Sequence, residues 1–414
     1  MKFFENINKP KMHLFTFLKW SVLGLLIGGI GGIIGAGFSH SLSFAASFRH
    51  DNPYIILLLP LGGLATIFLY RLAKMQKNGG TNEIIDAVLN KKAVKALIAP
   101  LIFITTFITQ LFGGSAGREG AALQIGGSFA STLAKPLRLN ETERKILVMS
   151  GMSAVFSALF GSPLAAALFT IEFVWVGTIF SSAFLPCALS AFAAWKVSSA
   201  LGVEAESILL DKKFSFTAVS FPKLMLFACC IALLGIIVYY VFHASHHLAE
   251  KFIKNEYLRI VLGAVLIIGL TILVGDQRYN GAGMNMALLA IEGEAHWFDF
   301  LLKLLFTAIT LSAGFKGGEI VPTFCIGATF GCVLGSMLGL DPSLAAALGL
   351  IGLFCALTNS PIASIVLSIE MFGANNLYTF ATVCVITFML AWNFGLYSSQ
   401  RIKFSSTNLI GEDE

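Results

Sequence analysis

The stretch that decides the fold is Gly113-Gly114-Ser115-Ala116-Gly117-Arg118-Glu119-Gly120-Ala121-Ala122-Leu123-Gln124-Ile125-Gly126-Gly127. Its first part is too rich in glycine to continue a helix, since each interior glycine costs about 1 kcal/mol relative to alanine. The part after Glu119 has a helical pattern. Arg118 and Glu119 are therefore adjacent residues of opposite charge at a helix start inside apolar sequence. An ionisable residue at mid-depth of a bilayer costs roughly 3 kcal/mol or more, so this pair indicates ion or proton handling.

The composition predicts a polytopic membrane protein. Of 414 residues, 56% are hydrophobic and only 12% are charged, with a mean hydropathy of +0.81. A soluble domain carries about 25% charged residues. Apolar runs long enough to cross a bilayer occur at 15–38, 54–69, 97–112, 224–242 and 260–274. At about 20 residues per crossing, we expect more than a dozen full or partial helices.

The charged residues set the expected topology and exclude some partners. The net charge is +5, and basic residues flank the first and last spans at Lys2, Lys9, Lys11, Lys19, Arg401 and Lys403. The positive-inside tendency then predicts a multi-pass protein of the cell membrane with both termini cytoplasmic. No secretory signal precedes the first span, so we expect the N-terminus to be retained. A basic face with interleaved aromatic residues is absent from the sequence, which argues against nucleic acid as a partner.

The seven cysteines all lie in apolar helical sequence, and their number is odd. We interpret them as small buried hydrophobic residues rather than as disulfide partners.

An internal repeat organises the chain. Ser162-Pro163-Leu164-Ala165 followed by Ile171-Glu172 matches Ser360-Pro361-Ile362-Ala363 followed by Ile369-Glu370. Upstream, Ser115-Ala116-Gly117 leading to Ile125-Gly126 and Phe129 matches Ser312-Ala313-Gly314 leading to Ile326-Gly327 and Phe330. Both offsets are roughly 200 residues, as in transporters built from two structural repeats. We predict a first transmembrane repeat at 1–203, a polar linker at 204–223 and a second repeat at 224–414, without a soluble C-terminal domain.

The hydrophobic sequence is broken at the repeated segments 113–120 and 314–322. Unpaired backbone at membrane depth is tolerated only where it is buried in protein or lines a cavity. The helices that restart after the breaks offer free N–H groups and the positive end of a dipole, which favour anions. Glycines at short spacing also serve close helix packing, and that alternative remains for these segments.

These residues resemble a known family. Gly117-Arg118-Glu119-Gly120, the two Ser-Pro motifs and Ser368-Ile369-Glu370-Met371 look like the CLC family of chloride channels and anion/proton antiporters. The resemblance implies an all-α polytopic fold of two inverted repeats whose broken helices meet near the midplane. It also implies a homodimer in the lipid bilayer that moves halide anions and protons, without cofactor or metal. Glu119 matches the gating glutamate, which occupies the anion site when charged and leaves it when protonated.

Departures from the family pattern suggest the transported ion. Asn78-Gly79-Gly80-Thr81-Asn82-Glu83 lacks the serine and proline of chloride-selective members. Ala121 stands where most members have proline, Glu319 inserts a carboxylate before Ile320, and Phe173 replaces the internal proton-transfer glutamate. This pattern resembles the fluoride-exporting branch, so a fluoride/proton antiporter is our leading interpretation. A chloride/proton antiporter and a passive voltage-gated chloride channel remain alternatives.

The resemblance carries the site residues over by position. Glu119 would be the gating and proton-coupled group, with Arg118, Glu319 and Thr323 in support. The anion-binding positions would be Gly80, Thr81, Gly120, Ala121, Ile320, Val321 and Tyr397. For Tyr397 the alternative is an interfacial tyrosine at a span end. For Glu319 it is a helix N-terminal cap.

Three further features have their own interpretations. Adjacent residues on a helix do not face each other, so we do not expect Arg118 to pair with Glu119; we expect it to raise the local positive potential. Glu172 and Glu370 close matching helices, which indicates a repeated structural or dimer role rather than direct proton transfer by Glu172. His243, His246, His247 and Glu250 have helical spacing that a metal site could use, yet they follow a span end, where polar residues are common.

An intramembrane enzyme is the rival function class. The sequence has no His-Glu-x-x-His motif, whereas it does have a repeat with two broken helices. We therefore expect a transporter and not an enzyme.

Overall fold

The structure is a computed structural model that describes residues 2–76, 78–90, 92–208, 210, 213–391 and 394–402, with side chains from residue 13 onward. Several charged residues lie outside the described part, either wholly or in their side chains: Lys2, Lys9, Lys11 and Lys403, named above, and Asp211 and Lys212 of the predicted linker.

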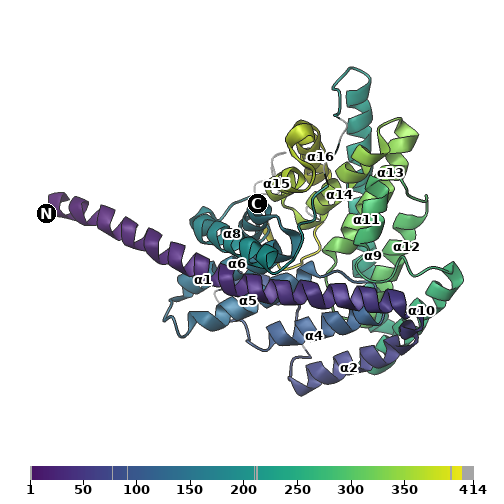
Figure 1. Ribbon diagram of the computed structural model, residues 1–414, viewed down its shortest axis with the longest axis horizontal. Helices are drawn as coiled ribbons and strands as arrows, with labels where there is room; N and C mark the ends of the chain where they lie inside the picture. Colours follow the sequence, from purple (N-terminus) through teal and green to yellow (C-terminus); the bar gives the residue numbers. More distant parts are fainter. Residues whose placement is uncertain are drawn as a thin grey trace.

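The described chain is a bundle of sixteen α-helices (Figure 1). The first half contains α1 (Lys2–Asp51), α2 (Leu59–Leu72), α3 (Thr81–Leu89), α4 (Ile98–Leu111), α5 (Glu119–Ala134), α6 (Glu141–Phe160), α7 (Pro163–Glu172) and α8 (Phe184–Ala200). The second half contains α9 (Ser220–Phe252), α10 (Glu256–Val274), α11 (Met284–Ile291), α12 (Asp299–Ala313), α13 (Ile320–Leu338), α14 (Pro342–Thr358), α15 (Pro361–Phe372) and α16 (Leu377–Leu390).

Short elements complete the fold. The 3-10 helices are η1 (Pro53–Leu58), η2 (Ser181–Ala183) and η3 (Ala374–Asn376). Two strands, β1 (Trp175–Val176) and β2 (Arg401–Ile402), pair in parallel and fasten the C-terminal segment to the end of α7.

The order of elements in α1 to α8 recurs in α9 to α16. In both halves a short helix, α3 or α11, is followed by a longer one, a break, and then a further helix, α5 or α13. A short 3-10 helix also precedes the last helix of each half: η2 precedes α8, and η3 precedes α16. The predicted all-α fold and both helix breaks are confirmed, because α4 ends at Leu111 before α5 begins, and α12 ends at Ala313 before α13 begins.

One part of the predicted repeat alignment is wrong. Ser115 lies in the loop before α5, whereas Ser312 lies inside the last turn of α12. The two loops differ in length, so the matched Ser-Ala-Gly triplets are not at equivalent positions. Ile125 of α5 and Ile326 of α13 do lie at the same helical position, counted from the Gly117 and Gly318 contact described below.

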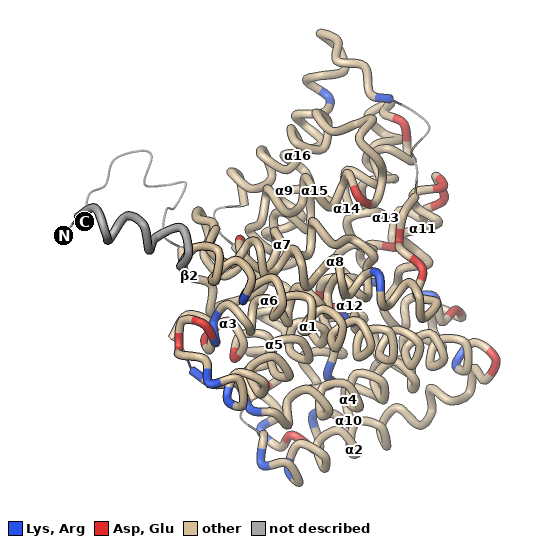
Figure 2. Tube along the Cα trace, turned by 60° about the vertical axis from the view of Figure 1, so that its left-hand side comes forward, with Lys and Arg blue, Asp and Glu red and all other residues tan. Residues whose placement is uncertain are grey.

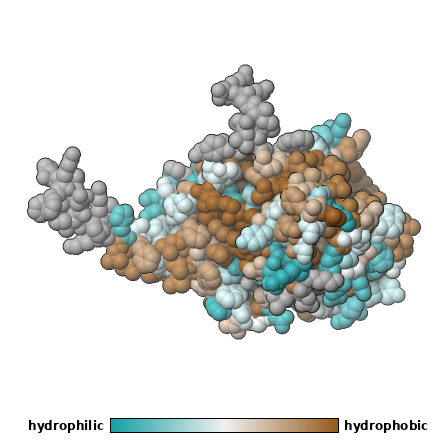
Figure 3. All heavy atoms as spheres, turned by 90° about the horizontal axis from the view of Figure 1, so that it is seen from above, coloured by the Kyte–Doolittle hydropathy of each residue, from teal (hydrophilic) through white to brown (hydrophobic). Residues whose placement is uncertain are grey.

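Six described helical segments are long and apolar enough to cross a membrane: His13–Asp51, Pro53–Leu72, Ser181–Ala200, Ser220–Phe252, Glu256–Val274 and Ile320–Leu338. Hydrophobic residues cover much of the face in view in Figure 3. Most Lys, Arg, Asp and Glu residues gather toward the edges of the trace in Figure 2. The predicted multi-pass architecture is therefore confirmed.

Close helix contacts account for some of the glycines. A Cβ added to Gly126 of α5 would lie 2.2 Å from the carbonyl oxygen of Gly151 in α6, and one on Gly327 of α13 would lie 2.4 Å from that of Gly349 in α14. Close packing is thus the role of these glycines, while the glycines of the two breaks serve the site described next.

The prediction for the cysteines is only partly confirmed. Five of the seven are buried, but Cys229 is exposed and Cys230 is half-buried. Both lie on α9, a long apolar helix with only part of its surface packed against the bundle.

Candidate functional site

The two helix breaks bind each other. The backbone N–H of Gly117 donates to the carbonyl oxygen of Gly318 at 2.6 Å, and the N–H of Gly318 donates to that of Gly117 at 2.8 Å. This antiparallel bridge satisfies backbone groups that would otherwise be unpaired inside the bundle. It also brings the first turns of α5 and α13 together, as predicted for two helix N-termini that converge.

The carboxylate of Glu119 lies at the start of α13. Glu119 is fully buried, and its Oε2 accepts hydrogen bonds from the backbone N–H groups of Val321 and Arg118, each at 3.1 Å. A Cβ on Gly117 would lie 2.7 Å from this oxygen, so glycine there leaves room for the carboxylate to fold back. A negative group is therefore held at the positive end of a helix dipole that belongs to the other half of the chain.

Arg118 approaches Glu119 directly, which corrects our prediction. Its Nε lies 3.6 Å from Glu119 Oε1, and its Nη2 forms an ion pair with Glu206 Oε1. The prediction failed because Arg118 is the N-cap residue, with φ of −120°, and so does not follow the helical spacing that separates adjacent side chains. Its guanidinium lies between two carboxylates.

The start of α3 packs on the start of α5. Thr81 Oγ1 donates to the carbonyl oxygen of Gly120 at 3.3 Å, and Gln124 Nε2 donates to the same oxygen at 3.1 Å. Gly80, the N-cap of α3, adopts a φ of +63°, which glycine tolerates without strain. Gly80, Thr81, Gly120 and the buried Ala121 are thus gathered near Glu119. We did not predict that Gln124 contacts this site.

Tyr397 is buried, with 3% of its surface exposed, and its hydroxyl has no hydrogen-bond partner within the described part of the chain. Its ring meets the edge of Phe173 at 5.8 Å between centroids. The N–H of Ser399 donates to Asn82 Oδ1 at 3.1 Å, which fastens this C-terminal segment to the start of α3. Burial argues against the interfacial alternative for Tyr397. A cavity of about 120 Å³ adjoins the tyrosine, with His243, Asn359 and Gln400 among the residues that line it.

The first turn of α13 contains the remaining predicted residues. Ile320 and Val321 are buried, and Thr323 Oγ1 donates to the carbonyl oxygen of Ile320 at 2.6 Å. Glu319 is the N-cap residue, yet its side chain makes no capping hydrogen bond. A hydrogen-bonded cap by Glu319 is therefore not observed, whereas its place at the positive end of the α13 dipole is compatible with the capping alternative.

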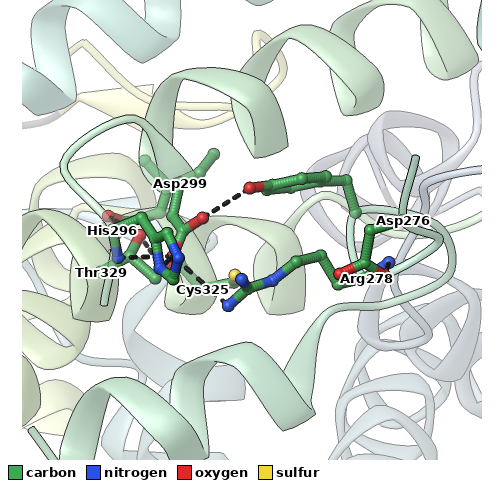
Figure 4. A network of polar contacts seen from close by, with 8 residues as sticks. Asp276, Arg278, His296, Asp299, Cys325 and Thr329 are labelled. Atoms are coloured by element: carbon green, nitrogen blue, oxygen red, sulfur yellow. Dashed lines mark hydrogen bonds and ion pairs between the residues drawn. The ribbon is translucent and has the colours of Figure 1, made fainter. Parts of the chain in front are cut away.

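A second group of polar contacts involves α12 and reaches the break before α5 at Ser115. Figure 4 shows Asp299 facing Arg278, with its carboxylate also bonded to the backbone of His296. One turn farther along α12, the fully buried Lys303 donates to Ser115 Oγ at 3.0 Å, to Tyr279 O at 3.0 Å and to Gly281 O at 2.8 Å. We did not predict a role for Lys303. The signal available was a lone lysine within the apolar segment 299–313.

The histidines near the end of α9 do not converge on one point, as the ligands of a metal ion would. His246 Nε2 lies 3.5 Å from Glu250 Oε1, and Arg259 approaches the same carboxylate at 3.9 Å. His243 instead contacts the carbonyl oxygen of Tyr239 at 3.0 Å. Within the described residues, no group of three or more His, Cys, Asp and Glu side chains could hold a metal ion.

The sequence is similar to those of known membrane transport proteins. A family model described as voltage gated chloride channel matches residues 61–391. A chloride/fluoride channel protein of Pseudomonas syringae pv. tomato is 32% identical over 394 residues, which cover 94% of this chain and 87% of that protein. An H+/Cl− exchange transporter of Yersinia pestis is 24% identical and covers 89% of this chain and 82% of its own length.

Solved structures resemble most of the chain. The crystal structure of a CLC-type fluoride/proton antiporter superposes with a TM-score of 0.90 and 32% identity, covering 94% of this chain and 99% of that one. A slow cyanobacterial Cl−/H+ antiporter superposes with a TM-score of 0.78 at 19% identity, covering 90% and 94%.

Proposed function

This chain belongs to the voltage-gated chloride channel family, the CLC family, and from that premise we propose that it is an antiporter that moves fluoride across the membrane in exchange for protons. The observation that carries the proposal is the bond from the Val321 N–H to Glu119 Oε2. A carboxylate there takes the position that an anion would need at the α13 N-terminus.

One residue then couples the two ions. The charged Glu119 competes with a halide for the Val321 N–H, so the anion and the charged carboxylate exclude each other. Protonation removes the charge and weakens the hold of the helix dipole on the side chain. The protonated side chain leaves the position, the halide takes it, and the proton travels with Glu119. Gly80, Thr81, Gly120, Ala121, Ile320, Val321 and Tyr397 would line the anion path.

Fluoride as the substrate has two supports. The relatives that are 32% identical carry fluoride in their names, while the chloride exchanger of Yersinia pestis is 24% identical. The start of α3 also lacks a serine hydroxyl, and Glu319 adds beside the path a carboxylate that makes no capping hydrogen bond. Supporting roles for Arg118, Glu319 and Thr323 belong to the same proposal.

The assembly is proposed with the function. Two subunits would each hold a separate anion path in the cell membrane, with both termini in the cytoplasm. The boundary between the repeats would fall in the segment between α8 and α9, which covers most of the predicted linker 204–223. The last part of that predicted linker is helical, because α9 begins at Ser220.

Reconstitution in liposomes tests the function. Vesicles loaded with fluoride or chloride are diluted into halide-free buffer, and ion and pH electrodes record both fluxes without a protonophore. We expect fluoride efflux to drive protons inward, with much slower chloride efflux. Equal fluxes of the two halides would support the chloride antiporter instead, and halide flux without proton movement would support a passive channel.

A further inference from the structure

Glu206 lies in the segment between α8 and α9, far in sequence from the helix breaks, and backbone hydrogen bonds hold the part of the segment around it. The N–H of Glu206 donates to Phe160 O at the end of α6 at 3.2 Å, and the N–H of Ile208 donates to Met371 O of α15 at 2.7 Å. The side chain of Glu206 is 20% exposed. The backbone bonds hold the carboxylate over the end of α6, within reach of the α5 N-terminus.

Arg118 is shared between Glu206 and Glu119. Its Nη2 pairs with Glu206 Oε1, while its Nε lies 3.6 Å from Glu119 Oε1. The contact with Glu206 is the hydrogen-bonded one, and Glu119 Oε1 has no hydrogen-bond partner within the described chain. A guanidinium binds a carboxylate most strongly through two parallel hydrogen bonds. Glu206 therefore competes for the donors that would otherwise turn to Glu119.

Other ionisable groups near Glu119 come from different elements. Glu319 is contributed by the α13 N-cap and Tyr397 by the C-terminal segment. Neither pairs with Arg118 in the described structure. Glu206 is thus placed to influence the gate through Arg118 without touching the anion path.

We propose that Glu206 is a positioning residue of the gate: by holding Arg118, it prevents this cation from fixing the charged Glu119 carboxylate at the start of α13. The inference rests on the proposed function. Removal of the Glu206 charge acts in one direction by two routes, because it frees Arg118 to pair with Glu119 and removes a nearby negative charge. Both effects favour the charged gate, so protonation requires more acid.

The test is the pH profile of fluoride efflux from liposomes containing Glu206→Gln. We expect the half-maximal pH to fall by about one unit, a tenfold change in proton activity, with the fluoride to proton ratio unchanged. Glu206→Asp keeps the charge but withdraws it by one methylene, and we expect a smaller fall in the same direction. Glu204→Gln is the matched control, because Glu204 is exposed in the same segment and its substitution should leave the profile unchanged.

A wild-type pH profile in folded Glu206→Gln would overturn the inference while leaving the proposed function intact. If Glu206→Gln does not fold, judged by gel filtration in detergent, then Glu206→Asp decides, and an unshifted profile overturns the inference. A wild-type protein that moves no halide against protons would refute the proposed function, and the inference with it.

Discussion

Glu172 and Glu370 cap each other's helices. The carboxylate of Glu172, at the end of α7, accepts from the N–H groups of Ile362 at 3.0 Å and Ala363 at 2.7 Å, in the first turn of α15. Glu370 of α15 accepts from the first turn of α7, from Leu164 at 3.0 Å and Ala165 at 2.9 Å. The repeated structural role predicted for this pair is thus observed as a reciprocal exchange between the two halves.

The exchange replaces the usual cap. Ser162 and Ser360 are the N-cap residues of α7 and α15, but neither side chain makes a capping hydrogen bond. Pro163 and Pro361 follow them and have no N–H to satisfy. The next two N–H groups of each helix therefore depend on a carboxylate from the other helix.

We predict that Glu370→Ala destabilises the protein by about 1–3 kcal/mol, because it leaves two N–H groups of α7 without their acceptor. Glu172→Ala should have a similar effect through α15. Thermal unfolding in detergent measures both, with the exposed Glu141→Ala as the control. An unchanged midpoint in both variants would show that water or another group replaces the caps.

Much of this arrangement could be predicted from local sequence. The glycine-rich breaks mark the helix starts because glycine opposes a continuous helix, and the Glu119 motif is the basis of the gating role that we propose for this residue. The duplication of Glu172 and Glu370 indicated a shared role. The sequence does not contain the partners, however, because the two glutamates contact residues about 190 to 206 positions away.

The contacts of Arg118 could not be predicted for a related reason. Glu206 is 88 residues away in a segment without helical periodicity. The Arg118 and Glu119 contact was missed because helical spacing was applied to a residue just outside the helix. Lys303 was missed because its three acceptors come from two separate loops that only the fold brings together.

Gly318→Ala should slow transport strongly. A Cβ at this position would lie 2.7 Å from the N atom of Gly120 and 3.0 Å from that of Glu119, so the bridge between the breaks must shift. We expect fluoride efflux to fall at least tenfold, because a misplacement of about 1 Å can cost a hundredfold in rate. Initial efflux rates, normalised to reconstituted protein, measure the effect.

Gly269→Ala is the control for that variant, because a Cβ on Gly269 of α10 would meet no atom within 4 Å. Its efflux should match the wild type. Wild-type efflux from Gly318→Ala would mean that the two breaks separate without loss of the anion path.

Lys303→Met should reduce the stability of the protein. Methionine fills a similar volume but donates no hydrogen bond, so Ser115 Oγ, Tyr279 O and Gly281 O lose a donor inside the bundle. Each buried acceptor left unsatisfied costs about 1–3 kcal/mol. Thermal unfolding should show a lower midpoint than in Lys251→Met, where the lysine is exposed. Equal midpoints in the two variants would contradict a supporting role for Lys303.

Glu119→Gln should separate anion movement from proton movement. Glutamine is close in size to the protonated glutamate, but it neither carries a proton nor becomes charged, so it cannot compete with a halide for the Val321 N–H as an anion does. We expect proton flux to fall at least tenfold, and any fluoride flux that remains should be passive and independent of pH. Simultaneous fluoride and pH recording from the same liposomes measures this, with Glu141→Gln as a control that keeps coupled flux. Proton coupling that survives in Glu119→Gln would mean that another carboxylate carries the proton. Glu319, whose side chain makes no capping hydrogen bond, would be the first residue to substitute next.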